Sequence, residues 1–96
     1  AEGTLKRILE LYPYDRQARV RLCQLLEERK DWPAFADCLR EWNEYHPEFI
    51  PVYLRRALLL IKLGRHGEAR TVIANGLTFA PKQKKLLELR TRLLTK

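Results

Sequence analysis

The residues best suited to chemistry in this chain are two cysteines, Cys23 and Cys38, and two histidines, His46 and His66. Thiolate and imidazole groups are common zinc ligands, and a thiolate can also act as a nucleophile. The cysteines are 15 positions apart, without a Cys-x-x-Cys spacing, and the four residues match no zinc-binding pattern. We expect Cys23 to pack in the core as a small hydrophobic residue. The sequence thus predicts no metal and no cofactor, and leaves open whether the cysteines pair.

Other catalytic patterns are missing from the sequence. The chain contains no serine, which excludes a serine nucleophile. It also lacks the glycine-rich loop with a lysine that holds nucleotide phosphates. We therefore predict that this chain is not an enzyme.

Charge is distributed unevenly along the 96 residues, whose formal net charge is +7. Residues 1–47 carry 8 basic and 9 acidic side chains, whereas residues 48–96 carry 11 basic and 3 acidic ones. The second half alone therefore has a net charge of +8, and such a field steers an acidic partner toward it. Two alternatives are a solvated basic surface and a surface that faces an acidic neighbouring segment.

Hydrophobic residues make up 46% of the chain and charged residues 32%, which is typical of one small, mostly helical domain. The apolar run 57–61 is too short to span a bilayer, and no signal peptide is recognisable. Because the chain contains no methionine, we expect it to be an excised piece of a longer protein or a processed product. The compartment stays unknown from these features, with the cytoplasm slightly favoured.

Apolar periodicity predicts six helices and no strands. Asp15 and Asp31 are expected to cap two of the helices, while Pro33 and Pro51 fit the first turns of the third and fourth. The predicted helices are residues 2–12, a helix from Asp15 to about Arg29, a third beginning after Asp31, a fourth ending at Leu63, and the segments 66–79 and 83–95. Short connections between them predict antiparallel neighbours.

Three prolines, Pro13, Pro47 and Pro81, lie 34 residues apart and close similar segments. Between the last two, a pattern of an aromatic, small residues and a turn glycine is found at Tyr53, Ala57, Gly64, Ala69 and Gly76. Small residues at these places let two antiparallel helices approach closely. This period and pattern resemble the tetratricopeptide repeat family.

The resemblance implies an all-α fold of antiparallel helix pairs, stacked as a right-handed α-solenoid. Within a single domain it implies half a repeat at 1–13, a degenerate repeat at 14–47, a full repeat at 48–81, and a capping helix or further half repeat at 82–96. Phe35 and Trp42 depart from the pattern, because small residues are expected there. We therefore expect wider or tilted packing in the degenerate repeat.

The resemblance also implies a function, because helices of this family line a groove that holds a segment of another protein. We expect the chain to be a protein-interaction scaffold of this kind, with an acidic partner favoured by its charge. Leu54, Leu58 and Ile61 are expected to form an apolar slot for a partner side chain, unless neighbouring helices cover them as core. The groove positions implied are Gln17, Val20, Arg21 and Gln24, then Leu54, Arg55, Leu58, Ile61 and Lys62, and finally Lys85, Glu88, Leu89 and Arg92.

Two further hypotheses remain open. The segment 67–73 also resembles the half-a-tetratricopeptide repeats of RNA-processing complexes, so the basic half could face nucleic acid. Base stacking there would need exposed aromatics, yet Tyr53 and Phe79 are expected to point inward, which argues against RNA. Self-association is the other hypothesis, through leucines of the end helices that a longer solenoid would bury. These are Leu5, Leu9, Leu86, Leu87, Leu93 and Leu94.

Overall fold

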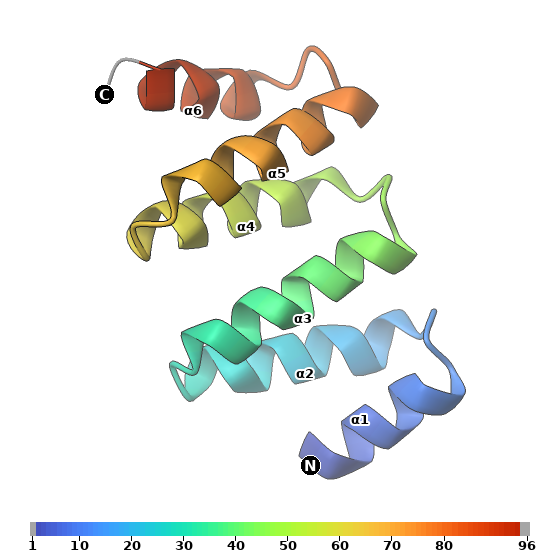
Figure 1. The fold of residues 1–96 in the computed structure, drawn as a ribbon. Coiled ribbons are helices and arrows are strands. Elements are labelled where there is room, and N and C mark those ends of the chain that lie inside the picture. Colours follow the sequence, from blue (N-terminus) through green and yellow to red (C-terminus); the bar gives the residue numbers. More distant parts are fainter. Residues whose placement is uncertain (1, 95–96) are drawn as a thin grey trace. The chain divides into compact units, whose positions relative to one another are not determined.

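A computed structural model describes residues 2–94 of the chain, and the described part is helical, with no strand (Figure 1). The predicted all-α class is therefore confirmed. The helices are α1 (Glu2–Leu11), α2 (Arg16–Glu28), α3 (Trp32–Tyr45), α4 (Ile50–Lys62), α5 (His66–Phe79) and α6 (Lys84–Leu94). None of these helices is long and apolar enough to cross a membrane.

The chain divides into two compact units, which we call unit 1 (Ala1–His46) and unit 2 (Pro47–Lys96). In unit 1, α2 packs against both α1 and α3. In unit 2, α5 packs against both α4 and α6. Consecutive helices within each unit run antiparallel, as the short connections predicted (Figure 1).

Helix starts follow the signals read from the sequence. The Asp15 carboxylate accepts a hydrogen bond from the Ala18 backbone N–H at 3.0 Å, and Asp31 caps α3 in the same way through the Ala34 N–H at 3.4 Å. Proline stands in the first turn of α3 and of α4, where its missing N–H costs no helical hydrogen bond. The predicted end of the last helix at residue 95 lies outside the described residues, as do residues 1 and 96.

Helix boundaries repeat with the 34-residue period of the prolines. Helices α2 and α4 each have 13 residues, and both ends of α4 lie 34 positions after those of α2. Helices α3 and α5 each have 14 residues, with the same offset at both ends. The repeat is therefore a property of the fold as well as of the sequence.

The core of unit 2 depends on close approach at Gly76. A Cβ added there would lie 3.0 Å from Leu86 Cδ1 and 3.0 Å from Tyr53 Cβ, so α4, α5 and α6 all converge on this glycine. The core residues around it are Tyr53, Ala57, Leu60, Ala69, Val72, Ile73, Leu86, Leu89 and Leu93. The predicted role of the small residues is confirmed for this helix pair.

Unit 1 has larger side chains at two of the equivalent positions. Phe35 and Trp42 stand at the positions of Ala69 and Gly76, and fewer backbone positions of α2 and α3 lie close to each other than of α4 and α5. This agrees with the wider packing expected from two large side chains. Buried residues of this unit are Ala18, Leu22, Cys23, Leu26, Phe35, Cys38 and Leu39.

Candidate functional site

The implied groove residues on α4 form an exposed stripe. Arg55, Leu58 and Lys62 follow each other at helical spacings and are all exposed, with Leu58 at 48%. Leu54 and Ile61 are half-buried and pack against the core of unit 2. The apolar slot is therefore divided: Leu58 is available to a partner, while its two apolar neighbours also belong to the core.

The implied residues on α6 are two exposed cations, Lys85 and Arg92, with Glu88 exposed between them. Leu89 was expected in the groove and this is wrong, because it is 5% exposed and lies in the core of unit 2. Its position follows from helix geometry, since it lies three residues from Leu86 and four from Leu93, on the face that packs inward.

Helix α6 carries positive charge at the end where it is least favoured. Lys84 and Lys85 begin the helix, although the N-terminal end of a helix dipole is itself positive. The Gln83 side chain accepts hydrogen bonds from the backbone N–H groups of Lys85 (2.7 Å) and Leu86 (3.2 Å), and so provides a neutral cap. The dipole and the two ammonium groups thus add their positive potentials at one place.

The implied residues on α2 belong to unit 1. Gln17, Arg21 and Gln24 are exposed, and Val20 is half-buried. The α2 set thus belongs to a different unit from the set on α4 and α6.

The two units differ in net charge, and each pairs some of its cations. Four cations of unit 1 form ion pairs with described residues, namely Lys6–Glu2, Arg29–Glu2, Arg40–Asp37 and Arg19–Glu41. Hydrogen bonding to Lys6 and the charge of its ammonium lower the pKa of Glu2 below its usual value.

In unit 2, the Arg65 guanidinium holds Glu68 through two hydrogen bonds of 2.7 and 2.9 Å. Six other cations of this unit make no ion pair with any described residue. They are Arg55, Arg70, Lys82, Lys84, Lys85 and Arg90. The charge excess read from the sequence is therefore presented on the surface of unit 2.

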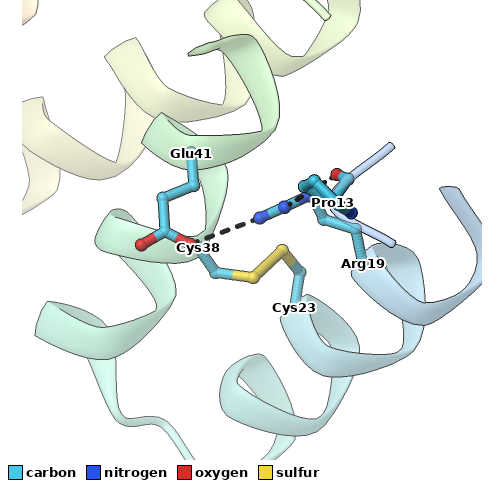
Figure 2. Close-up of a disulfide and its surroundings, with 5 residues drawn as sticks. All are labelled: Pro13, Arg19, Cys23, Cys38 and Glu41. Carbon is cyan, nitrogen blue, oxygen red and sulfur yellow. Dashed lines mark hydrogen bonds and ion pairs between the residues drawn. A yellow bond between two sulfur atoms is a disulfide. The ribbon is translucent and has the colours of Figure 1, made fainter. Parts of the chain in front are cut away.

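A disulfide joins Cys23 of α2 to Cys38 of α3, whose Cα atoms lie 5.7 Å apart (Figure 2). Both cysteines are buried, so the core position expected for Cys23 is confirmed, and the structure decides the pairing that the sequence left open. Disulfide sulfurs are not free thiolate ligands. Within residues 2–94, no three or more His, Cys, Asp and Glu side chains gather as a metal site.

Beside the disulfide lies a buried cation that sequence reasoning missed (Figure 2). Arg19 is 2% exposed, and its guanidinium donates to the Pro13 carbonyl at 3.2 Å and to the Glu41 carboxylate at 3.3 Å. The same guanidinium lies 5.1 Å from the ring centre of Tyr45.

The burial of Arg19 could have been predicted from the 34-residue period. Arg19 stands at the position of Tyr53, which is buried and donates from its hydroxyl to the Pro47 carbonyl at 2.8 Å. A position that the repeat makes buried in one unit is expected to be buried in the other. The arginine is thus a structural counterpart of the tyrosine.

Aromatic exposure bears on the RNA hypothesis. Tyr53 points inward as expected, but the expectation for Phe79 is wrong, because its side chain is 53% exposed at the end of α5. Its ring stacks on Tyr53, with ring centres 6.4 Å apart. The other strongly exposed rings, Tyr12 and Tyr14, lie in unit 1, whose charges are balanced.

The leucines considered for self-association divide in a similar way. Leu86 and Leu93 are buried in the core of unit 2, so they offer no surface to a second copy. Leu5, Leu9 and Leu87 are half-buried, and Leu94 is 73% exposed.

Comparison with protein-family models and with curated proteins finds no match for this chain.

Proposed function

We propose that this chain is a tetratricopeptide-type helical repeat that acts as a scaffold and binds an acidic segment of another protein. The proposal includes the right-handed stacking typical of such repeats, and it assigns the chain a role in binding rather than in catalysis. The binding residues are the implied positions on α4 and α6 of unit 2 and, as a separate set, those on α2 of unit 1.

One observation carries the proposal: an exposed apolar side chain lies between exposed cations on the same helix stripe. Leu58 has Arg55 three residues before it and Lys62 four residues after it. An apolar anchor supplies binding energy through burial, while the surrounding cations select acidic neighbours and increase the association rate. The unpaired lysines at the start of α6 belong to the same unit and strengthen the same field.

The scaffold proposal is supported further by the repeated helix boundaries and by the close approach at Gly76. Both agree with the pattern of small residues and prolines read from the sequence. RNA binding is the second candidate, and it is favoured only by the charge of unit 2. Aromatic rings that could stack on bases are few there, since Phe79 is 53% exposed and Phe49 is half-buried.

A displayed library of random peptides tests this proposal, because selection from it does not require the natural partner. We expect selection on the wild-type chain to enrich peptides with an apolar residue beside Asp or Glu. Leu58→Glu should abolish binding of these peptides, with an unchanged helical circular dichroism signal. Leu11→Glu, at an exposed leucine of unit 1, is the matched control and should bind normally.

Labelled single-stranded oligouridine is the opposing probe in the same assay. Tight binding of this RNA, together with no peptide enrichment, would replace the scaffold by a nucleic-acid-binding role. Unfolding of Leu58→Glu would instead place Leu58 in the core and remove the anchor from the proposal.

A further inference from the structure

The described part of unit 2 has a hollow of about 490 Å³ between α5 and α6 that lies apart from the proposed binding stripe. Its lining is mostly apolar and includes Ile73, Leu77 and Leu94. Arg70 and Arg90 also line it, one on each helix. Neither arginine forms an ion pair with a described residue.

Unit 1 contains the counterpart of this hollow at an offset of 68 residues, which is two repeat periods. Five lining residues of unit 2 correspond to lining residues of a hollow of about 440 Å³ in unit 1. The pairs are Ala74 with Lys6, Leu77 with Leu9, Thr78 with Glu10, Pro81 with Pro13, and Arg90 with Leu22. The two hollows are therefore equivalent places in the repeat.

The two hollows differ in their walls. In unit 1, α3 supplies a further wall through Glu41, Glu44 and Tyr45. In unit 2, the lining comes only from α5, α6 and the connection between them. No described helix of unit 2 occupies the place that α3 occupies in unit 1.

Two equivalent leucines, Leu26 and Leu94, differ in exposure because only the hollow of unit 1 has this further wall in the described part of the chain. Leu26 on α2, which packs against α3, is 4% exposed. Its counterpart on α6, Leu94, lines the hollow of unit 2 and is 73% exposed. An apolar side chain of this size, beside an apolar hollow, favours a covering partner.

The charges indicate the chemistry of that partner. The helix that walls the hollow of unit 1 presents two glutamates to it, and one of them pairs with a buried arginine. The hollow of unit 2 presents arginines at both borders and no acidic residue. We propose that this hollow is a second docking site, which takes an acidic amphipathic helix of a partner protein in the place that α3 has in unit 1.

This inference goes beyond the proposed function, because it uses another surface and a helical ligand. A helix fits a hollow between two helices through apolar residues spaced at three and four positions. Acidic residues at the edges of its apolar face would then meet Arg70 and Arg90.

A fluorescein-labelled peptide with the sequence of residues 31–46 and Cys38→Ala is the probe. This segment is an acidic helix that already covers the equivalent hollow, and its binding to the full chain is measured by fluorescence anisotropy at about 50 mM salt. We expect saturable binding that Arg70→Glu with Arg90→Glu weakens by roughly tenfold or more. Absence of binding by the wild-type chain would overturn the proposal.

A charge-swapped peptide sharpens the test. The probe with Glu41→Lys and Glu44→Lys should bind the wild-type chain weakly and recover affinity for the doubly substituted chain. Lys84→Glu with Lys85→Glu is the control, because it makes the same change in net charge outside the lining. Equal weakening by the control pair would show a general charge effect and overturn the site.

Two further arms separate this site from the other surfaces. Leu58→Glu should leave binding of the helical probe unchanged, so a failure of the proposed function and a failure of this inference are distinguishable. Light scattering of the unliganded chain tests for a second copy as the occupant. A concentration-dependent mass that Leu94→Glu abolishes would show self-association at this hollow and overturn the partner helix.

Discussion

At position 19 of unit 1 stands an arginine, and at the equivalent place of unit 2 stands Tyr53. Both side chains donate to a proline carbonyl six residues earlier, at 3.2 Å and 2.8 Å. Both also contact an aromatic ring at equivalent positions of α3 and α5, namely Tyr45 and Phe79. The same backbone arrangement is thus held by a charged contact in one unit and an aromatic contact in the other.

The helix pairs differ as well at a second pair of equivalent positions. Cys23 and Cys38 are covalently joined, whereas the equivalent Ala57 and Val72 both belong to the core of unit 2. Where unit 2 has Gly76, unit 1 has a tryptophan. Unit 2 therefore depends on close packing of small residues, while unit 1 has a cross-link between helices that pack less closely. The comparison teaches that one repeat geometry tolerates two different sources of stability.

The largest effect is expected from the disulfide. Cys23→Ala with Cys38→Val places the Ala–Val pair of unit 2 in unit 1, and it should lower the stability of α2 and α3 by about 3 kcal/mol, because the unfolded chain loses its cross-link. Hydrogen exchange of individual amides measures this loss, and reduction of the wild-type chain should reproduce it. An equal loss of protection in α4 and α5 would show that the units do not differ in this way.

A smaller effect is expected in unit 2 from Gly76→Ala. The added methyl would lie 3.0 Å from Tyr53 Cβ, which belongs to a packed core, so we expect about 2 kcal/mol of destabilisation from overpacking. Gly67→Ala on the same helix is the control, since nothing lies within 4 Å of its added Cβ. Urea denaturation compares the two variants. Equal stability would mean that α5 does not rely on its glycine.

The turns between paired helices give a third comparison. Lys30 has φ 57° and Gly64, at the equivalent position, has φ 77°, so both adopt the left-handed conformation that favours glycine. Lys30→Gly should stabilise unit 1 by about 1 kcal/mol, and Gly64→Ala should destabilise unit 2 by a similar amount. Thermal unfolding with hydrogen exchange measures both. If Lys30→Gly lowers the stability of unit 1, the lysine side chain contributes more to stability than its left-handed backbone conformation costs.

The smallest expected effect is a loss of stability at alkaline pH, and it concerns Tyr53. Burial raises the pKa of the Tyr53 phenol, because the phenolate is disfavoured away from water. Its contribution to stability is present below the unfolded pKa of about 10 and is lost as pH rises through the higher folded value.

The matching variant for this pH effect is Tyr53→Phe. It should remove the alkaline loss of stability from α4 and α5, which hydrogen exchange or urea denaturation at pH about 9 and 11 would measure. An unchanged alkaline loss in the variant would assign the effect to another group.

Much of the architecture was predictable from local patterns. Apolar spacing located the helices, and Asp15 and Asp31 marked the starts of two of them, because a cap acts through hydrogen bonds only three residues long. The period of the prolines predicted equivalent helix boundaries. Gly76 could be assigned to a close helix contact because no other residue type leaves that space.

The exposure of individual side chains was harder to predict. Leu89 and Phe79 were both placed on the wrong side, because one apolar position on a helix differs from the next only by its neighbours in space. Arg19 went unnoticed because a guanidinium is usually solvated, and its burial depends on a carbonyl of the α1–α2 connection and on a carboxylate and a ring of α3.

The sequence alone thus determined the helical class, the repeat period and the excess of positive charge after residue 47. The charge excess is a sum over residues, and the helical class and the repeat period are patterns along the chain. None of them depends on contacts between segments that are distant in the sequence. Only the tertiary structure decided that Cys23 joins Cys38, that Leu58 and Leu94 are exposed, and that Arg70 and Arg90 line one hollow. Such features depend on which helix faces meet, and that choice is made by packing over the whole unit.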